Sequence, residues 1–395
     1  MSQDVPQFRG GRRILQVSLG LAAIGAVAVA VGVFVAPTRL MSSYLIAYAY
    51  VATTAVGALI FLMICNAMRA GWPVAVRRML EAIIGALPLV ALLFIPLVFG
   101  LDRLYPWLRP ETITDEHTLH LLHHKAPYLN LTGFLARAAF YLVAWLVVGE
   151  LLRRWSMRRD GDPSIDVSSK LQRLSAGALP LVGLALVFAS FDWLMSLDFT
   201  WVSSMYPICV FGGGILSAIA LLTVLTFSAQ RAGLLPGVSE SHYYALGRLL
   251  LAFTIFWAYV NFFQFMLIWM ANHPHEVDYY LRRWEGPWSA VTVLVVATHF
   301  VIPFFVLLSY GLKRKPARLT AVAVWLLVAH YFDVHWLVVP EARAAHGFPY
   351  HWLDVAALLL VGGLSVAFAT LRLRGKATMP VGDPVLPRAL RYESL

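Results

Sequence analysis

Ten separate apolar runs, each longer than about 20 residues, constrain the fold of this chain more than any other feature of its sequence. A helix needs about 20 apolar residues to cross roughly 30 Å of hydrocarbon. Of the 395 residues, 60% are hydrophobic and 13% are charged, whereas soluble domains have about 45–50% apolar and 25% charged residues. Because a helix satisfies its own backbone hydrogen bonds in lipid, the sequence predicts an all-α polytopic membrane protein.

We predict ten transmembrane helices within a single integral membrane domain, residues 1–395. The helices cover residues 14–35, 40–66, 76–99, 131–154, 172–197, 204–228, 243–271, 286–312, 318–339 and 351–373. The first apolar run is too long for the core of a signal peptide, so we expect it to stay as a helix. Residues 1–13 and 374–395 are expected to lie outside the membrane as an N-terminal segment and a C-terminal tail.

The lysines and arginines predict the direction of the helices. The segments on the side of the two termini carry 22 of the 31 Lys and Arg residues, and those on the opposite side carry 7. Since positive charge accumulates on the cytoplasmic side of membrane proteins, we expect both termini to be cytoplasmic. The net charge of +10 is then explained without a nucleic-acid partner.

The cysteines and the short motifs exclude several classes of redox protein. Cys65 and Cys209 both fall inside apolar runs, and the sequence contains no CxxC, no CxxCH and no set of four cysteines. Iron–sulfur clusters and c-type haem are therefore excluded within this chain. The sequence also lacks a Walker loop and a GxGxxG motif, so it shows no recognisable nucleotide site.

The stretch "ASFDWLMSLDFTW", residues 189–201, ends the fifth helix and contains Asp192 and Asp198. An aspartate in the middle of a membrane helix costs about 2.5–3.5 kcal/mol on insertion scales. At 1.5 Å per residue, Asp192 lies roughly 7 Å below the outer surface. We therefore expect Asp192 to have a role, either in a buried ion pair or on a route for protons.

Further polar side chains form a layer in the outer half of the membrane, with a trail leading inward. The members of this layer besides Asp192 are Arg137, Asn261, Gln264, His299, His330 and Asp333. His330 and Asp333 are neighbours on one helix face, because they are three residues apart. On the inner side, Glu81 and Glu150 lie within about two helical turns of the cytoplasmic ends.

Three interpretations of this set stay open. In the first, Arg137 pairs with Asp192 or Asp333 and the set is structural. In the second, His299 and His330 are the two axial ligands of a b-type haem. In the third, which we favour, the layer forms a quinone-adjacent pocket or a proton path with Glu81 and Glu150 as its inner half. Acid–histidine chains carry protons in membranes, and a neighbouring carboxylate fixes the tautomer of a histidine.

The outer loops are rich in histidine and aromatic residues. The loop between the third and fourth helices reads "DEHTLHLLHHKAPYLN", with histidines at positions 117, 120, 123 and 124. Such a group can bind a metal, but on an aromatic-rich outer loop a surface for a protein partner is the better interpretation. We therefore predict no metal site in this chain.

Two segments resemble the F subunit (ActF) of bacterial alternative complex III, a quinol:cytochrome c oxidoreductase. They are "FDWLMSLD" at 191–198 and "HYYALGRLLLAFTIFWAYVNFFQFMLIWMANHPHEVDYYLRRW" at 242–284. The resemblance covers residues 180–345 and is only topological elsewhere. It implies two four-helix bundles, here helices 2–5 (40–197) and 6–9 (204–339), and two flanking helices. It also implies a multi-pass protein of the bacterial inner membrane.

The resemblance further implies partners and site residues. The expected partners are an NrfD-like sister subunit of the polysulfide-reductase type, periplasmic subunits bearing multihaem cytochrome c and iron–sulfur clusters, a terminal oxidase, and lipids. The chain itself is expected to hold no cofactor, with menaquinone or ubiquinone as the quinone. The polar residues of the motifs fall on Asp192, Asp198, Asn261 and Gln264.

This sequence departs from the family pattern at two places on the outer surface. Phe199 stands where many members have proline, and His275 precedes Glu276 where acidic residues usually follow the turn. We expect Asp198, His275 and Glu276 to contribute to a partner interface. Three alternatives remain: the NrfD-like sister subunit that binds quinol, a structural anchor for periplasmic cytochromes, and a stand-alone transporter with a midplane site made by both halves of the chain.

Overall fold

The computed structural model describes residues 6–161, 167–341 and 349–394, and most of these residues lie in helices. Over these residues the chain forms no β-strand, and its only sheet-like pairing is an isolated bridge between Gln7 and Ala377. Ten helical segments are long and apolar enough to cross a membrane. The predicted number of membrane-spanning helices is therefore confirmed for the described residues, and the chain is a multi-pass membrane protein.

Six of the ten spans consist of one continuous α-helix. These helices are α1 (Arg12–Val35), α2 (Pro37–Ala67), α8 (Leu131–Gly161), α10 (Tyr206–Arg231), α11 (Glu240–Ala271) and α17 (Trp352–Leu373). Two more, α9 (Ser168–Trp193) and α16 (Pro316–Val338), are followed by the short turns η4 (Met195–Leu197) and η6 (Val339–Glu341). The predicted boundaries are close to these, and most differences extend a helix by a few residues into the aqueous ends.

The third span is broken, which corrects the prediction of a continuous helix at 76–99, and the eighth, predicted at 286–312, is helical from Trp288 to Leu308 with a π-helical turn inside it. The third consists of η1 (Trp72–Val76), α3 (Arg77–Ile84), α4 (Leu87–Leu93) and α5 (Ile95–Val98). Pro88 and Pro96 lie in the first turns of α4 and α5, where the missing N–H of proline is tolerated. The eighth consists of α13 (Trp288–Val296), a π-helical turn η5 (Ala297–Val301) and α14 (Ile302–Leu308).

The connections between the spans contain further short helices. On the side opposite the termini these are α6 (Leu101–Leu104), η2 (Pro106–Leu108), η3 (Pro110–Thr112), α7 (Glu116–Lys125) and α12 (Pro274–Trp284). On the side of the termini they are α15 (Tyr310–Arg314) and α18 (Leu386–Leu390). Asp115 caps the first turn of α7 by accepting a hydrogen bond from the backbone N–H of Thr118.

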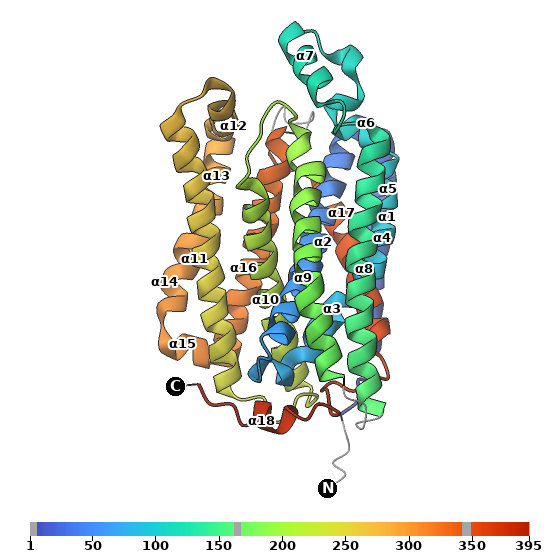
Figure 1. Cartoon of the computed structure of the whole chain (residues 1–395), viewed down its shortest axis with the longest axis vertical. Coiled ribbons are helices and arrows are strands. Elements are labelled where there is room, and N and C mark those ends of the chain that lie inside the picture. The colour runs from blue at the N-terminus through green and yellow to red at the C-terminus, as the bar shows by residue number, and fades with distance from the viewer. Residues whose placement is uncertain (1–5, 162–166, 342–348, 395) are drawn as a thin grey trace.

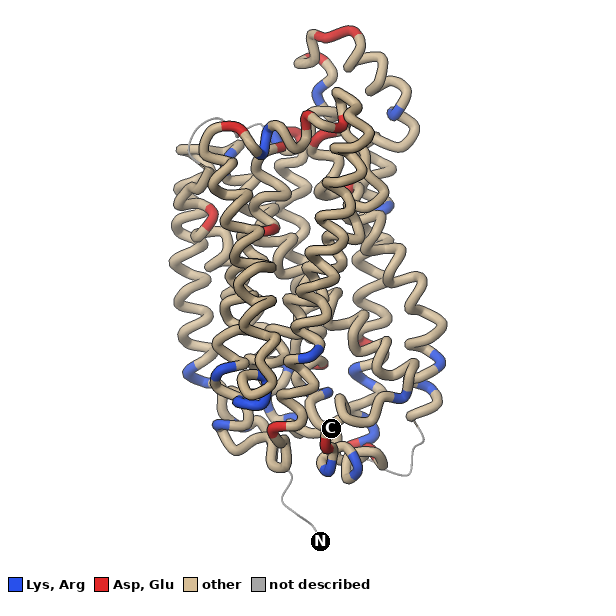
Figure 2. The backbone as a smooth tube through the Cα atoms, turned by 90° about the vertical axis from the view of Figure 1, so that its left-hand side faces the viewer, with Lys and Arg blue, Asp and Glu red and all other residues tan. Residues whose placement is uncertain are grey.

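The two ends of the helical body differ in charge. The start of α1 and the C-terminal tail lie at the same end, and α7 projects from the opposite end (Figure 1). Lysine and arginine gather at the end that carries the termini, as Figure 2 shows. This distribution is the one that the orientation rule requires if that end is cytoplasmic. Below, the end with α7 and α12 is called the outer end.

Helices α2 and α10 lie at the centre of the helical body. Helix α2 packs against α9, α10, α16 and α17, and α10 packs against α2, α9, α11 and α16. Most of the apolar window of α2 is buried, whereas α1 is largely exposed and packs mainly against α17. The two central helices are therefore the frame on which the residues of the other helices are placed.

Three consecutive glycines let α10 approach three helices at once. A Cβ on Gly212 would contact Phe256 of α11, and one on Gly213 would lie 2.7 Å from Cε1 of His330 on α16. A Cβ on Gly214 would lie 2.9 Å from the backbone oxygen of Thr53 on α2. Small residues at such contacts permit close backbone packing in membranes. The glycine triplet therefore brings three helices around one stretch of α10.

We expect Gly57→Ala to destabilise the protein, because a Cβ there would lie 2.4 Å from the carbonyl oxygen of Gly214. Overpacking of this kind costs about 1–3 kcal/mol. The matched control is Gly183→Ala in α9, where a Cβ meets nothing within 4 Å and alanine is the better helix former by up to about 1 kcal/mol. Thermal unfolding in detergent measures both variants, and equal unfolding temperatures would contradict the close contact between α2 and α10.

Candidate functional site

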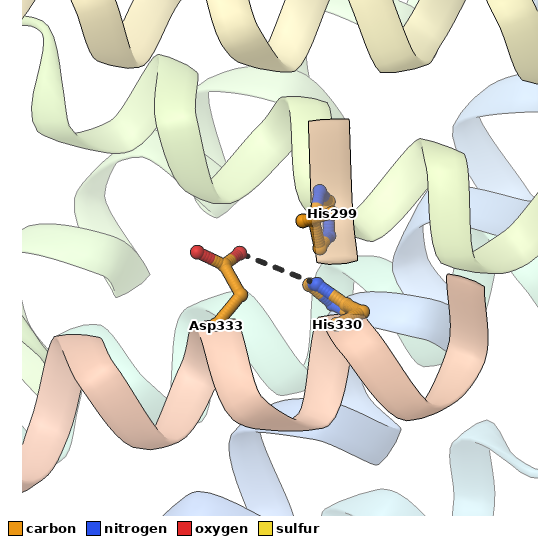
Figure 3. A group of neighbouring side chains, drawn as sticks. All are labelled: His299, His330 and Asp333. Carbon is orange, nitrogen blue, oxygen red and sulfur yellow. Dashed lines mark ion pairs between the residues drawn. The ribbon is translucent and has the colours of Figure 1, made fainter. Parts of the chain in front are cut away.

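Two histidines and one aspartate form a buried group where η5 faces α16 (Figure 3). Nδ1 of His330 lies 3.4 Å from Oδ2 of Asp333, one turn away on α16. The ring centroid of His299, on η5, is 5.9 Å from that of His330. One potential ligand atom from each residue lies within 4.8 Å of the other two. We call His299, His330 and Asp333 the His–His–Asp cluster.

The cluster lies deep in the membrane-spanning region. None of its three side chains belongs to a residue that is more than 2% exposed. His299 and His330 are each 11 residues from the outer ends of their spans, Trp288 and Glu341. At 1.5 Å per residue, both histidines lie roughly 16 Å from that end. Three residues of the predicted polar layer, His299, His330 and Asp333, therefore come together from two membrane spans.

The π-helical turn positions His299. Such turns are rare and occur mostly as single turns inside α-helices, frequently at functional sites. Pro303 follows His299 by four residues, so it lacks the N–H that an α-helix would supply to the His299 carbonyl. The sequence "THFVIP" contained this signal, although sequence reasoning predicted a regular helix at these positions.

Trp257 of α11 connects the cluster to an aromatic cavity. Its indole N–H donates a hydrogen bond to Oδ2 of Asp333 at 3.2 Å, and its ring centroid lies 4.1 Å from that of His299. Trp257 also lines a cavity of about 550 Å³ between α11, α13 and α14. Tyr259 and Phe262, each 62% exposed, lie at the rim of this cavity. We call it the aromatic cavity; it opens toward the lipid-facing surface.

The two polar residues predicted on α11 lie beside this cavity or near it. Asn261 lines the cavity, and its side-chain N–H donates to the backbone oxygen of Trp257 at 2.9 Å. Gln264 accepts a hydrogen bond from the Ser203 hydroxyl at 3.0 Å and donates to the Tyr280 hydroxyl at 3.1 Å. Because Tyr280 also lines the cavity, Gln264 fixes one of its walls.

A b-type haem between the two histidines does not fit this packing. The macrocycle would have to extend on every side of the line that joins the two ligating nitrogens. The Asp333 carboxylate occupies one side of His330. A Cβ on Gly213 would already be 2.7 Å from His330, and Trp257 packs on His299. The haem interpretation therefore finds no support in the geometry.

Arg137 and Asp192 form a separate ion pair between α8 and α9. Nε of Arg137 is 2.9 Å from Oδ2 of Asp192, and a second guanidinium nitrogen is 3.0 Å from Oδ1. The Tyr141 hydroxyl donates to the same carboxylate at 2.9 Å. Asp192 is fully buried, and the Arg137 guanidinium lies 3.9 Å from the centre of the Tyr128 ring. The pairing with Arg137 that the first interpretation expects for Asp192 is therefore present, and Asp192 does not contact the cluster.

Glu150 lies within reach of three guanidinium groups near the inner end. It accepts hydrogen bonds from Arg153 and Arg154 of α8 and from Arg372 of α17, at distances between 2.6 and 3.3 Å. Bonds of this kind hold a carboxylate strongly. Glu150 therefore joins two helices as a structural ion-pair partner, and its contacts do not point toward the cluster.

Glu81, the other inner glutamate, belongs to a second ionic group. Its carboxylate contacts Arg77 at 3.5 Å and also pairs with Arg78, which pairs in turn with Asp160. Arg77 reaches Asp383 of the C-terminal tail at 2.6 Å. The group is buried and fastens the tail to α3 and α8. The predicted role of Glu81 in a proton path gains nothing from this arrangement.

The predicted partner-interface residues lie at the outer end, but Asp198 is held within the protein. Its carboxylate accepts hydrogen bonds from Thr200 at 2.9 Å and from Arg282 at 2.5 Å. Burial would raise the pKa of Asp198, but the bonds from Thr200 and Arg282 outweigh burial and hold this pKa below its usual value. His275 is exposed and Glu276 is partly exposed on α12, so these two remain available to a partner.

The outer-loop histidines lie on α7, and all four are exposed. The ring of His117 stacks on that of His275 with centroids 5.8 Å apart, so α7 and α12 meet at this point. Within the described residues, the His–His–Asp cluster is the group of three donors close enough to share a metal ion, and the outer histidines form none.

Several residues that shape the site were missed by sequence reasoning. Trp257 and Tyr50 both contact the cluster, and the Tyr50 ring centroid is 5.6 Å from that of His330. Gly213 gives His330 its space. A single aromatic residue or glycine inside an apolar run carries no distinguishing local signal. The run of three glycines at 212–214 is a signal that could have indicated a close helix contact.

No model of a known protein family matches this sequence, and no curated protein matches it. The likeness of residues 180–345 to the F subunit of alternative complex III therefore stays a prediction.

We expect Arg137→Met to destabilise the protein by about 3–5 kcal/mol, because it leaves the buried Asp192 carboxylate without its charge partner. The double variant Arg137→Met/Asp192→Leu removes both charges and is expected to regain much of that loss. Unfolding in detergent measures the series. A single variant as stable as the wild type would show that the pair contributes nothing.

The lowered pKa of Asp198 predicts a pH dependence of stability. A carboxylate whose pKa is lowered in the folded state stabilises the fold at pH values above its pKa in the unfolded chain, which is about 3.9. This contribution is lost as the pH falls through the pKa of the folded state. Asp198→Asn should therefore cost roughly 1–3 kcal/mol at neutral pH, and the difference from the wild type should shrink as the pH falls below about 4. Glu276→Gln serves as the control, and a difference for Asp198→Asn that does not vary with pH would refute this assignment.

Proposed function

We propose that this chain is a membrane subunit of a respiratory quinol:cytochrome c oxidoreductase of the alternative complex III type. In this proposal the chain holds no redox cofactor of its own. The aromatic cavity receives the ring of a membrane quinone, either menaquinone or ubiquinone. The His–His–Asp cluster takes up protons beside that cavity and passes them on.

The role of Trp257 carries this proposal. Trp257 lines a ligand-sized cavity and also hydrogen-bonds to the carboxylate of a buried group of titratable residues. The cavity volume of about 550 Å³ falls in the range of small-molecule sites, about 300–1,000 Å³. Its aromatic walls suit a planar ring, and Asn261 supplies a polar group beside it.

The proposed chemistry divides protons and electrons between subunits. Oxidation of a quinol to a quinone releases two protons and two electrons. Imidazole and carboxylate groups in the membrane accept and relay protons, and we assign this role to His330 and Asp333, with His299 beside them. The electrons must leave through partner subunits that carry iron–sulfur clusters and c-type haem, because this chain contains no cysteine set for either group.

Other observations support the same assignment. The motifs at 191–198 and 242–284 resemble the F subunit of such a complex. Helix α2 packs with α3, α4 and α9, while α10 packs with α11 and α16, and α1 pairs with α17. This packing suits two four-helix bundles with two flanking helices. The charge distribution suits cytoplasmic termini in a bacterial inner membrane (Figure 2).

Two alternatives differ in what they require of the cluster. A structural anchor for periplasmic cytochromes is favoured by the ion pairs of Asp192 and Glu150, which hold helices together. A purely structural anchor does not require the buried titratable residues of the cluster. A stand-alone transporter needs binding groups from both halves of the chain, whereas all three cluster residues come from the second half.

The test uses the purified complex in proteoliposomes and compares the wild type with His330→Leu and Asp333→Asn. Quinol oxidation and proton movement are recorded together. We expect proton movement to fall by at least about 100-fold, the lower end of what a positioned proton-transfer group contributes, because the relay has lost a titratable member. Loss of turnover as well would place the cluster at the quinone pocket itself.

His335→Gln is the matched control for these variants. His335 is buried on the same helix and lies 3.4 Å from a carboxylate, that of Asp354, but it belongs to a different polar group. This control should keep both activities. If the cluster variants also keep both activities in an intact complex, the anchor is the correct interpretation and the proposal is wrong.

A further inference from the structure

The imidazole nitrogens of the cluster are buried without hydrogen-bond partners. Within the described residues, neither ring nitrogen of His299 has a partner, and Nε2 of His330 has none. Nδ1 of His330 is 3.4 Å from Asp333, but it makes no hydrogen bond of good geometry. Buried polar groups in folded proteins are nearly always satisfied, so each exception calls for an explanation. Two such histidines facing one carboxylate are a set of donor atoms directed at a common point.

The arrangement of these atoms suits a metal ion. One nitrogen from each histidine and one oxygen from Asp333 lie within 4.8 Å of one another. Zinc binds histidine nitrogen and carboxylate oxygen at about 2.0–2.2 Å, which places pairs of its ligands at roughly 3–4 Å. Small rotations of the three side chains would therefore close the set around one ion. Two nitrogens and one oxygen are a donor set of divalent zinc and iron rather than of calcium or magnesium.

The surroundings of the cluster also resemble those of a metal site. Ligating carboxylates in such sites are usually hydrogen-bonded by a second group, and Trp257 donates a hydrogen bond to Oδ2 of Asp333. The close approach of Gly213 to His330 fixes the position of that ring. With three protein ligands, a fourth coordination position stays open.

We propose that His299, His330 and Asp333 form a binding site for a divalent transition-metal ion of the Zn²⁺ class. The ion and the proton compete for the same imidazole nitrogens, because only the deprotonated nitrogen binds a metal. Occupation by Zn²⁺ would therefore stop proton transfer through the cluster. That consequence rests on the proposed function, whereas the binding of the ion does not.

The test measures the binding of metal to the purified protein and does not depend on an assay of enzymatic activity. The purified protein is freed of metal with a chelator and titrated with Zn²⁺, and bound zinc is counted by elemental analysis. Co²⁺ is used in parallel, because its visible absorption reports the ligand geometry. We expect one tight equivalent of metal that raises the unfolding temperature, and we expect this equivalent to be lost in His299→Leu, His330→Gln and Asp333→Asn.

Trp257→Phe provides a variant that keeps the ligands. It removes the hydrogen bond to Asp333 and leaves a smaller aromatic ring beside His299; loss of such a supporting contact weakens metal binding roughly 10–100-fold. His117→Ala/His275→Ala is the surface control, since exposed histidines bind metal adventitiously. Circular dichroism and the unfolding temperature without metal check that each variant is folded.

The outcomes separate the two proposals. Metal binding that survives in the folded cluster variants, or disappears in the surface control, overturns the metal site. So does the absence of any tight equivalent in the wild type. Tight zinc binding that depends on the cluster would support the metal site. If, in addition, His330→Leu and Asp333→Asn leave proton movement in the proteoliposomes unchanged, the metal site stands and the proposed proton relay is contradicted.

Discussion

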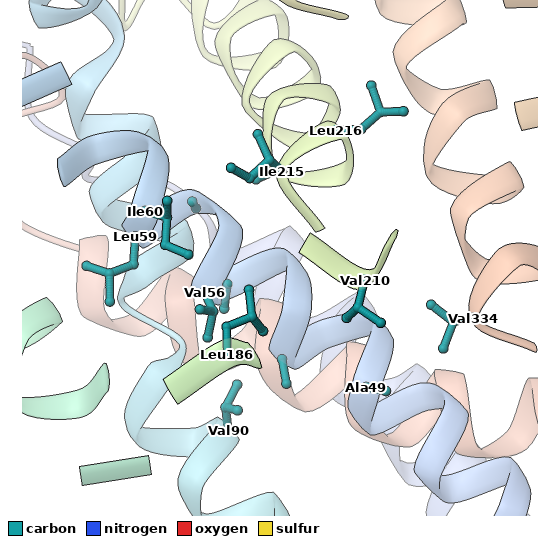
Figure 4. Close-up of a cluster of buried hydrophobic side chains, with 14 of the residues drawn as sticks. Ala49, Val56, Leu59, Ile60, Val90, Leu186, Val210, Ile215, Leu216 and Val334 are labelled. Carbon is teal, nitrogen blue, oxygen red and sulfur yellow. The ribbon is translucent and has the colours of Figure 1, made fainter. Parts of the chain in front are cut away.

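The close contact of α10 with three other helices is the constraint on which the rest of the structure depends. Gly57 and Gly214 bring the backbones of α2 and α10 together, and Gly213 leaves the space that His330 fills. Apolar side chains of α2, α10 and α16 pack around this contact (Figure 4). In lipid, where the hydrophobic effect does not drive helices together, such packing supplies much of the attraction. The glycines therefore determine both the helix arrangement and the position of the cluster.

The polar residues inside this frame fall into two kinds. Asp192, Glu81 and Glu150 each contact at least one arginine, so their charges are balanced by the structure. Asp192 and Glu150 thereby join neighbouring helices, whereas both arginine partners of Glu81 lie on α3. His299 and His330 have buried nitrogens without partners in the described part of the chain. A membrane protein tolerates such expensive groups mainly where they carry out a function. The presence of an arginine partner, rather than depth, separates Asp192, Glu81 and Glu150 from the candidate site.

The sequence predicted what depends on local pattern. The ten spans followed from the length of the apolar runs, and a partner for Asp192 followed from the cost of a lone charge in hydrocarbon. Pairings across long stretches of chain were not predictable, as with Arg77 and Asp383, which are 306 residues apart. The π-helical turn at His299 and the position of Trp257 depend on how helices pack, and no local periodicity encodes that. The proton-path role expected for Glu81 and Glu150 stays a prediction; four of their arginine partners lie three or four residues away on the same helix, and Arg372 comes from another helix.

The central claim is that the His–His–Asp cluster changes its protonation when quinol is oxidised. Redox-triggered infrared difference spectroscopy on the intact complex, with histidine and aspartate isotope-labelled, tests this most directly. We expect carboxyl and imidazole bands that change on quinol oxidation, that are absent in Asp333→Asn and that persist in His335→Gln. Difference spectra that are identical in the wild type and in Asp333→Asn would contradict it.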